Sequence, residues 1–167
     1  MKRILISTLF LGILAGCASS PSMDANKDAG TAASANSNSS QSNSIPAHAD
    51  PKNALAQKRS VYFALDEYAL QDDGKDIVQS HAAYLSKNPA QKITIEGNAD
   101  EQGSREYNLA LGQKRAHAVR TAMTVLGVKE AQIETISWGE ERPVATGHTE
   151  EAWSKNRRAD IKYGGEK

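Results

Sequence analysis

The stretch GNADEQGSREYNLALGQKRAHAV, residues 97–119, decides the fold because the hydrophobic pattern changes within it. Apolar and polar residues alternate from Lys92 to Gly97, which predicts a half-buried β-strand. From about Ser104 to Leu126 apolar residues recur at helical spacing, and Gly127 follows as a helix stop. The predicted buried face of this helix consists of Leu109, Gly112, Ala116, Val119, Met123 and Leu126. The sequence therefore predicts a strand, a polar loop and a long helix.

The same periodicities continue on both sides of this stretch. Residues 60–65 are rich in β-branched and aromatic types and predict a strand, and Asp66 follows at a turn or helix-cap position. Further strands are predicted over 133–138 and 159–163, and a second helix over 72–87. The order is strand, helix, strand, helix, strand, loop and strand. It predicts an α/β (α+β) two-layer sandwich over residues 53–167, with helices packed on a mixed sheet of about four strands.

The chain begins with the features of an export signal, MKRILISTLFLGILAGC. Lys2 and Arg3 supply positive charge, and the apolar stretch from 4 to 14 is too short for a membrane-spanning helix, which needs roughly 20 residues. Residues 1–16 are therefore predicted to be a signal peptide, with a retained membrane helix as the alternative. Residues 14–17 resemble the bacterial lipobox, which implies that Cys17 is lipidated. Two or more acyl chains there would give stable membrane anchoring.

The segment after the cysteine has a strongly biased composition. Residues 18–50 contain nine Ser, eight Ala and four Asn, with Met23 and Ile45 as the only larger apolar residues. Such a segment buries too little apolar surface to offset the entropy of ordering it. Residues 17–52 are therefore predicted to be a disordered tether that follows the lipidated cysteine, and His48 falls within it.

Composition and motifs argue against several classes of function. The formal net charge is zero at pH 7, which argues against binding nucleic acid through a broad basic field. The four histidines are scattered without the spacing of a metal site, and His81 and His117 are expected to be packing or surface residues. Cys17 is the only cysteine, and the sequence contains neither a GxSxG motif nor a P-loop. These patterns give no positive support for an enzymatic function.

Asp100 and Arg115 form a candidate binding pair. Asp100 follows the predicted strand, and Arg115 adjoins the apolar stripe of the helix, where its stem can be buried while its planar fork faces the domain edge. A carboxylate favours an ammonium and a guanidinium favours a carboxylate, so the pair suits a zwitterionic amino acid. Arg115 lies roughly 15 Å along the helix from Ser104, so the loop must fold back to meet it. The alternative is that Asp100 is an ordinary turn residue.

A linked set of motifs extends over the whole predicted domain. It comprises IEGNADEQG at 95–103, EYNL at 106–109, Leu111, Arg115-Ala116, Val119, VYF at 61–63 with Asp66, WGE at 138–140 with Pro143, and SKNRR at 154–158. Together these motifs resemble the OmpA-like peptidoglycan-binding domain family, and the N-terminal features are similar to its lipoprotein branch. The family fold, helices against a mixed sheet, agrees with the pattern prediction.

The resemblance implies a non-enzymatic protein without a cofactor that binds the meso-diaminopimelate of the peptidoglycan stem peptide non-covalently. Asp100 would engage the ammonium of the ligand, Arg115 its carboxylate, and the other site residues would shape or support the pocket. The expected set is Asp100, Arg115, Asn108, Leu109, Asp66, Phe63 and Arg158. Helix capping remains the alternative for Asp66, and a solvated or inter-strand salt-bridge role remains the alternative for Arg157 and Arg158.

The resemblance also implies a place in the cell. The protein is expected to be an outer-membrane lipoprotein of a Gram-negative bacterium, with its domain in the periplasm and with TolB and other Tol proteins as partners in envelope integrity and cell division. The alternatives are a TolB-docking module with weak or no wall binding, and a wall-acting hydrolase that uses Asp100 or Glu101. The sequence departs from the family pattern at Ala64, Asn98, Gln102 and Lys114, which is expected to alter affinity and fine geometry.

Overall fold

The computed structural model describes residues 45–165. The predicted signal peptide, Cys17 and most of the predicted tether lie outside the described residues. The described residues belong to one compact unit, which begins at Ser42. Between residues 45 and 165, every helix is too short or too polar to cross a membrane.

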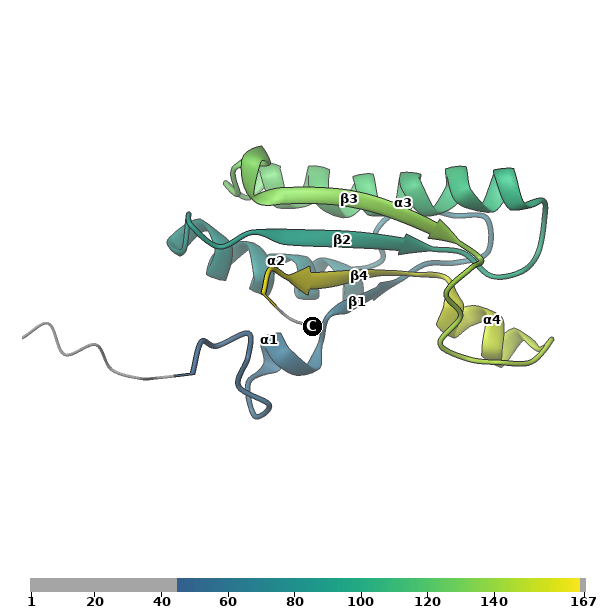
Figure 1. Cartoon of the computed structure of the whole chain (residues 1–167), viewed down its shortest axis with the longest axis horizontal. Coiled ribbons are helices and arrows are strands. Elements are labelled where there is room, and N and C mark those ends of the chain that lie inside the picture. Colours follow the sequence, from purple (N-terminus) through teal and green to yellow (C-terminus); the bar gives the residue numbers. More distant parts are fainter. Residues whose placement is uncertain (1–44, 166–167) are drawn as a thin grey trace, which may run out of the picture. The chain divides into compact units, whose positions relative to one another are not determined.

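In the described part of the chain, four strands form one mixed sheet (Figure 1). The strands are β1 (Ser60–Tyr62), β2 (Ile93–Asn98), β3 (Ile133–Gly139) and β4 (Arg158–Tyr163), in the spatial order β1-β4-β2-β3. β2 and β3 are parallel, whereas β4 is antiparallel to both β1 and β2. This mixed sheet confirms the predicted fold class.

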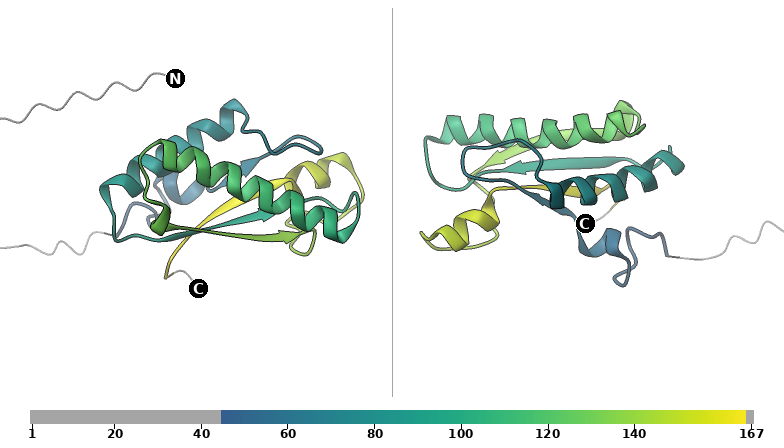
Figure 2. Two further views of the ribbon diagram at one scale, coloured as in Figure 1. Left: turned by 90° about the horizontal axis from the view of Figure 1, so that it is seen from above. Right: turned by 180° about the vertical axis from the view of Figure 1, so that it is seen from behind.

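Two long helices cover one face of the sheet, as the views from above and behind show (Figure 2). α2 (Asp72–Lys87) packs near β1, and α3 (Arg105–Val125) packs against β2 and β3. The three short helices are α1 (Ala54–Gln57), the 3-10 helix η1 (Glu130–Gln132) and α4 (Glu150–Asn156). The core between helices and sheet includes Val61, Val78, Leu85, Ile95, Val119, Met123 and Ile161. Both predicted long helices are confirmed.

Two glycines bring α3 unusually close to the sheet. A Cβ at Gly97 of β2 would lie 1.8 Å from the carbonyl oxygen of Gly112 on α3, and a Cβ at Gly112 would lie 2.4 Å from Ser137 Oγ. Both distances are far below any van der Waals contact, so the helix and the strand meet backbone to backbone. This contact fixes the depth at which the site residues of α3 meet the end of β2.

The prediction for β1 is wrong at its C-terminal end. The strand ends at Tyr62, and a turn follows in which the amide of Glu67 donates to the carbonyl of Ala64 at 3.3 Å. Asp66 lies in this turn with a φ of 58°, a left-handed conformation that aspartate tolerates better than most residues. The N-cap of α2 is Gln71, so the helix-capping alternative for Asp66 is also wrong.

The predicted buried face of the long helix is wrong at both ends. Leu109 and Leu126 are 51% and 48% exposed, whereas Asn108, Leu111 and Arg115 are buried. The buried stripe of α3 therefore carries two polar side chains at the end that approaches the loop after β2. A prediction that counts only apolar residues misses polar residues that are buried with hydrogen-bond partners.

The structure also differs from the predicted boundary between tether and domain at residues 52 and 53. His48 is only 6% exposed, and its ring stacks on Tyr163 of β4 at 4.2 Å between centroids. The amides of Ala49 and Asp50 donate to the carbonyl of Pro46, which closes a turn before α1. Packed structure therefore begins before the predicted domain, because an aromatic contact holds a segment whose composition is otherwise polar.

Candidate ligand-binding site

Asp100 follows β2 in the loop that leads to α3, and its carboxylate is held at both oxygens. Oδ2 pairs with Nη1 of Arg157 at 3.2 Å, and Oδ1 accepts a hydrogen bond from the amide of Gln102 at 3.1 Å. Asp100 is only 5% exposed. The loop therefore presents a carboxylate in a fixed orientation at the C-terminal end of a central strand.

Arg115 lies on the buried stripe of α3, and its guanidinium group donates to three main-chain carbonyls. Nε donates to Glu67 at 2.8 Å, Nη1 to Asn98 at 2.9 Å and Nη2 to Ala64 at 3.2 Å. The Asn98 carbonyl lies at the end of β2, two residues before Asp100. The side chain thus reaches back to the strand end from which the loop starts, because helical side chains point toward the helix N-terminus.

The predicted presentation of Arg115 at the domain edge is wrong, because the residue is fully buried. Burial lowers the pKa of Arg115 to about 10, while the nearby charges of Asp100 and Asp66 act in the opposite direction. The guanidinium group therefore remains cationic at neutral pH. Arginine has five N–H donors, and among the described residues three of them donate to the carbonyls of Ala64, Asn98 and Glu67.

Two of the departures from the family pattern contact Arg115 through the main chain. Ala64 and Asn98 each supply a carbonyl oxygen to the guanidinium group, so this part of the geometry does not depend on their side chains. The Asn98 side chain itself is 1% exposed, and its amide donates to the carbonyl of Glu96 at 3.0 Å. These departures therefore leave the position of Arg115 intact.

Phe63 and Asp66 border Arg115 from the segment after β1. The centre of the Arg115 guanidinium lies 5.4 Å from the centroid of the Phe63 ring, which is 3% exposed. Asp66 is exposed, and its Oδ1 accepts a hydrogen bond from the hydroxyl of Tyr107 on α3. Phe63 is thus a buried wall, and the pair of Asp66 and Tyr107 lies at the exposed rim of the same region.

Arg157 completes this region, and the sequence prediction did not include it in the site. The residue caps the C-terminus of α4 and is 5% exposed. Its guanidinium group donates to Asp100, to Glu150 of α4 and, through Nε at 3.3 Å, to the carbonyl of Phe63. Burial alone would lower the pKa of Arg157, but the hydrogen bonds to the carboxylates of Glu150 and Asp100 raise it. Arg157 therefore joins the ends of β1 and β2 to α4.

Arg158 lies outside this region, although the prediction included it. Ala159 and Ile161 of β4 face the core, so Arg158 and Asp160 point to the opposite face of the sheet. Arg158 Nε pairs with Asp160 Oδ2 at 3.0 Å, and Nη2 donates to the carbonyl of Arg142. Both partners are buried and lie on β4, so this ion pair is neither the solvated role nor the inter-strand salt bridge expected as the alternative for Arg158. The same alternation places Arg157 on the core side, and this signal could have identified it from the sequence.

Asn108 and Leu109, predicted as neighbours in the pocket, point in different directions. Asn108 is fully buried beneath the loop, and its side-chain amide donates to Glu140. A Cβ at Gly103 would lie 3.4 Å from its Oδ1, so this part of the loop lies directly over Asn108. Leu109 instead lines a separate hollow of about 320 Å³ with Trp138 and Glu141. Asn108 supports the loop that carries Asp100, and Leu109 does not.

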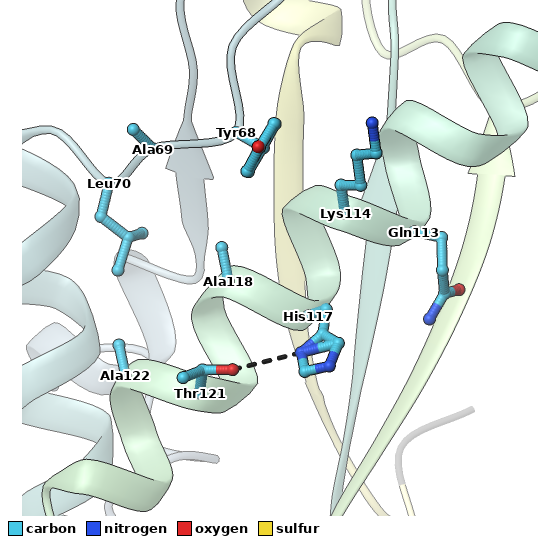
Figure 3. A pocket seen from close by; sticks show the side chains of 9 residues that line it. All are labelled: Tyr68, Ala69, Leu70, Gln113, Lys114, His117, Ala118, Thr121 and Ala122. Atoms are coloured by element: carbon cyan, nitrogen blue, oxygen red, sulfur yellow. Dashed lines mark hydrogen bonds between the residues drawn. The ribbon is translucent and has the colours of Figure 1, made fainter.

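A larger apolar hollow of about 610 Å³ lies between α3 and the segment from Tyr68 to Leu70 (Figure 3). Lys114 stands at its edge, with Nζ 5.4 Å from the centroid of the Tyr68 ring. None of the predicted site residues lines this hollow. Between residues 45 and 165, no group of three or more His, Cys, Asp or Glu side chains is arranged to hold a metal ion.

Comparison with known proteins identifies the family. The OmpA family model matches residues 62–157. The peptidoglycan-associated lipoproteins of Pasteurella multocida and Haemophilus influenzae are both 48% identical over 104 residues, which is 62% of this chain and 69% and 68% of theirs.

Solved structures agree with this result. The peptidoglycan-associated lipoprotein from Burkholderia pseudomallei is 55% identical, with a TM-score of 0.68 over 70% of this chain and 98% of that one. The C-terminal domain of Helicobacter pylori MotB, at 20% identity and a TM-score of 0.59 over 65% of this chain and 86% of its own, shares the fold alone. This chain belongs to the OmpA family and groups with the peptidoglycan-associated lipoproteins.

Proposed function

We propose that this protein binds peptidoglycan non-covalently through the meso-diaminopimelate of the stem peptide, and so holds the outer membrane to the cell wall. The observation that carries the proposal is the fixed arrangement of Asp100, Arg115 and Arg157 where β2 ends. One carboxylate and two guanidinium groups meet there, beside an exposed rim at Asp66 and Tyr107. The names of the similar lipoproteins support an association with peptidoglycan.

The proposed ligand is a zwitterion, and each of its charged groups has a counterpart. Its ammonium would approach Asp100, which already shares its charge with Arg157. Its carboxylate would take the two remaining N–H donors of Arg115 in a bidentate contact. Arg115 is fully buried, so ligand entry requires the turn from Ala64 to Glu67 to move aside. Loops that carry binding residues are commonly the less stable parts of a domain.

The proposed setting is the periplasmic face of the outer membrane. Cys17 would carry the acyl chains, and the segment after it would let the domain reach the wall. Many anchored copies would bind together with an avidity that one site lacks. TolB and other Tol proteins are proposed as partners in envelope integrity and cell division. We propose binding rather than catalysis, in agreement with the names of the relatives.

The test is co-sedimentation of the compact unit, residues 42–167, with purified peptidoglycan sacculi. The wild type should pellet with the sacculi, and free meso-diaminopimelate should release it. Asp100→Asn and Arg115→Lys should remain in the supernatant, with circular dichroism to show that they are folded. Arg158→Lys is the matched control for Arg115→Lys, because Arg158 is also buried but lies on the opposite face of the sheet from the proposed site. This control should pellet like the wild type. Wild type that stays in the supernatant would exclude wall binding.

A further inference from the structure

Residues 45–57, which we call the strap, lie against the far end of the domain from Asp100. The ring of His48 is stacked on Tyr163 with an interplanar angle of 11°, and its Nδ1 is 2.9 Å from the hydroxyl of Tyr84 on α2. Arg59 reaches back over the strap and donates to the carbonyls of His48 and Leu55. The strap is thus docked through one buried ring and a few hydrogen bonds.

His81 on α2 contacts Lys58, the residue that follows the strap, and Tyr163, on which the strap docks. It is 1% exposed, and its two ring nitrogens contact groups that differ in kind. Nε2 lies 2.8 Å from the carbonyl of Lys58, which can only accept, so Nε2 carries the proton. Nδ1 lies 2.7 Å from the hydroxyl of Tyr163 and accepts its hydrogen bond. The docked arrangement therefore uses the neutral form of His81.

We propose that the strap is a detachable segment, docked on Tyr84 and Tyr163 when His81 is neutral and released in acid when His81 gains a proton. A second proton on Nδ1 would turn the Tyr163 hydroxyl from donor to acceptor and would place a positive charge in a buried site, which costs free energy. Among the described residues, the titratable and charged groups that face His81 or its partners are His48 and Arg59 from the strap side, Tyr163 from β4 and Tyr84 from α2. Arg59 already supplies one positive charge there.

The direction of the pH effect follows from His81. Burial lowers the pKa of His81 below its ordinary value of 6.5. The hydrogen bond to the carbonyl of Lys58 acts in the opposite direction, and the positive charge of Arg59 lowers the pKa further. A proton is therefore bound more readily in the released state than in the docked state. Docking is fully stable above about pH 6.5 and weakens as the pH falls below it. One proton changes the docking equilibrium by at most about tenfold per pH unit.

Release would lengthen the chain that precedes the domain. Thirteen residues, 45–57, span at most about 45 Å when pulled taut, and release adds the difference between this length and their docked span. Under the proposed function, on which this consequence rests, acid would increase the distance that the domain can reach from its membrane anchor. The ligand site would be unaffected, because the strap contacts the end of β4 at Tyr163, which pairs with the start of β2 at Ile93.

The test is amide hydrogen exchange of the full chain at pH 7.5 and pH 5.5, expressed as protection factors. The amides of Ala49 and Asn53, both hydrogen-bonded within the strap, report docking. Their protection should fall about tenfold in acid, the change expected for one proton over one pH unit below 6.5. The amide of Ile161 in β4 reports the core and should keep its protection. His81→Gln should remove the pH effect, and His117→Gln, on the exposed face of α3, should preserve it.

Three results would overturn the proposal. The first is equal strap protection at both pH values, and the second is an equal loss at Ile161, which would mean general unfolding. The third is a pH effect that survives in His81→Gln. If that variant does not fold, the His81 ring is titrated by NMR in the wild type. The docked ring must titrate below its ordinary pKa of 6.5, and a His81 midpoint at or above 6.5 contradicts the mechanism. No readout requires peptidoglycan, so the result is independent of wall binding.

Discussion

Arg115 donates to main-chain carbonyls rather than to carboxylates, and this determines what a substitution there removes. Arg115→Lys keeps the positive charge but cannot span the carbonyls of Ala64, Asn98 and Glu67 with one ammonium group. Each buried carbonyl left without a donor costs about 1–3 kcal/mol, so the variant should lose about 2–4 kcal/mol of unfolding free energy. Urea denaturation measures the loss. Arg105→Lys, at an exposed ion pair with Glu141, should change stability by less than about 0.5 kcal/mol.

Asp100 and Arg157 form the buried ion pair of the site, and both are about 95% covered. Asp100→Asn would leave the Arg157 guanidinium with its charge only partly compensated by Glu150, which is exposed. Removing one partner of a buried pair typically costs about 3–5 kcal/mol, and the remaining partner Glu150 should reduce the loss to the lower end of that range. A thermal melt that leaves Asp100→Asn as stable as the wild type would contradict the structural role assigned to this pair.

How far the site could be predicted from the sequence differs from residue to residue. The sequence predicts Asp100 and Arg115 as a pair, because a loop acid and a helix arginine stand out against apolar patterns. The family resemblance of their shared basic motif predicts Arg158 and not Arg157, whereas the alternation of β4 places Arg157 on the core side. The complete burial of Arg115 could not be predicted, because it depends on the turn after β1, whose residues are remote in sequence.

At the scale of elements, the packing of α3 on β2 depends on Gly112. A methyl group there would meet Ser137 Oγ at 2.4 Å and the carbonyl of Gly97 at 2.9 Å, so the helix must move away from the strand. Overpacking of this kind costs about 1–3 kcal/mol, and occasionally more, although alanine favours the helix by about 1 kcal/mol. Gly112→Ala should therefore lower the urea midpoint. Gly127→Ser is the comparison variant. A Cβ at Gly127 would meet nothing within 4 Å, but φ there is +93°, so this variant measures backbone strain without crowding.

α4 is held to the site by two exposed carboxylates, and this predicts a response to acid. The hydrogen bond from Arg157 lowers the pKa of Glu150, and hydrogen bonds from Trp153 and His148 lower the pKa of Glu101. The stabilisation of α4 by these two carboxylates is present above their ordinary pKa of about 4.5. It is lost as the pH falls through their lowered pKa values. Trp153 fluorescence, measured in a Trp138→Phe background, should change in this range. Glu101→Gln should abolish the change, and an unaltered change would exclude Glu101 as its source.

The elements that the sequence predicted well share a physical property. α2 and α3 are long and repeat buried apolar residues over several turns, so the pattern survives the polar residues within it. α4 has only seven residues, and the apolar pattern predicts a loop there. Thr149 nevertheless accepts a hydrogen bond from the amide of Ala152, and two acids follow it in the first turn. The sequence alone contains this capping signal. α1 is capped in the same way by Asn53, but its four residues include no buried side chain and therefore no apolar pattern.

At the scale of the whole domain, the direction of the strands separates two regions. β2 runs from Ile93, opposite Tyr163, to Asn98, and Asp100 follows it. The strap therefore lies where β2 begins, and the proposed ligand site lies where it ends, as the positions of α1 and α4 in Figure 1 show. A substitution at one end can alter the stability of the shared sheet, but the substituted residue contacts none of the groups at the other end.

This separation predicts the result of removing the part of the strap before Asn53. A chain that begins at Asn53 loses the buried ring of His48 and its stacking on Tyr163, and should lose about 1–3 kcal/mol of unfolding free energy relative to the chain from Ser42. Urea denaturation at pH 7.5 measures this loss, and co-sedimentation with sacculi should be equal for the two chains. Equal urea midpoints would mean that His48 adds no net stability. Weaker sedimentation by the shorter chain, while it remains folded, would mean that the ligand site depends on residues before Asn53.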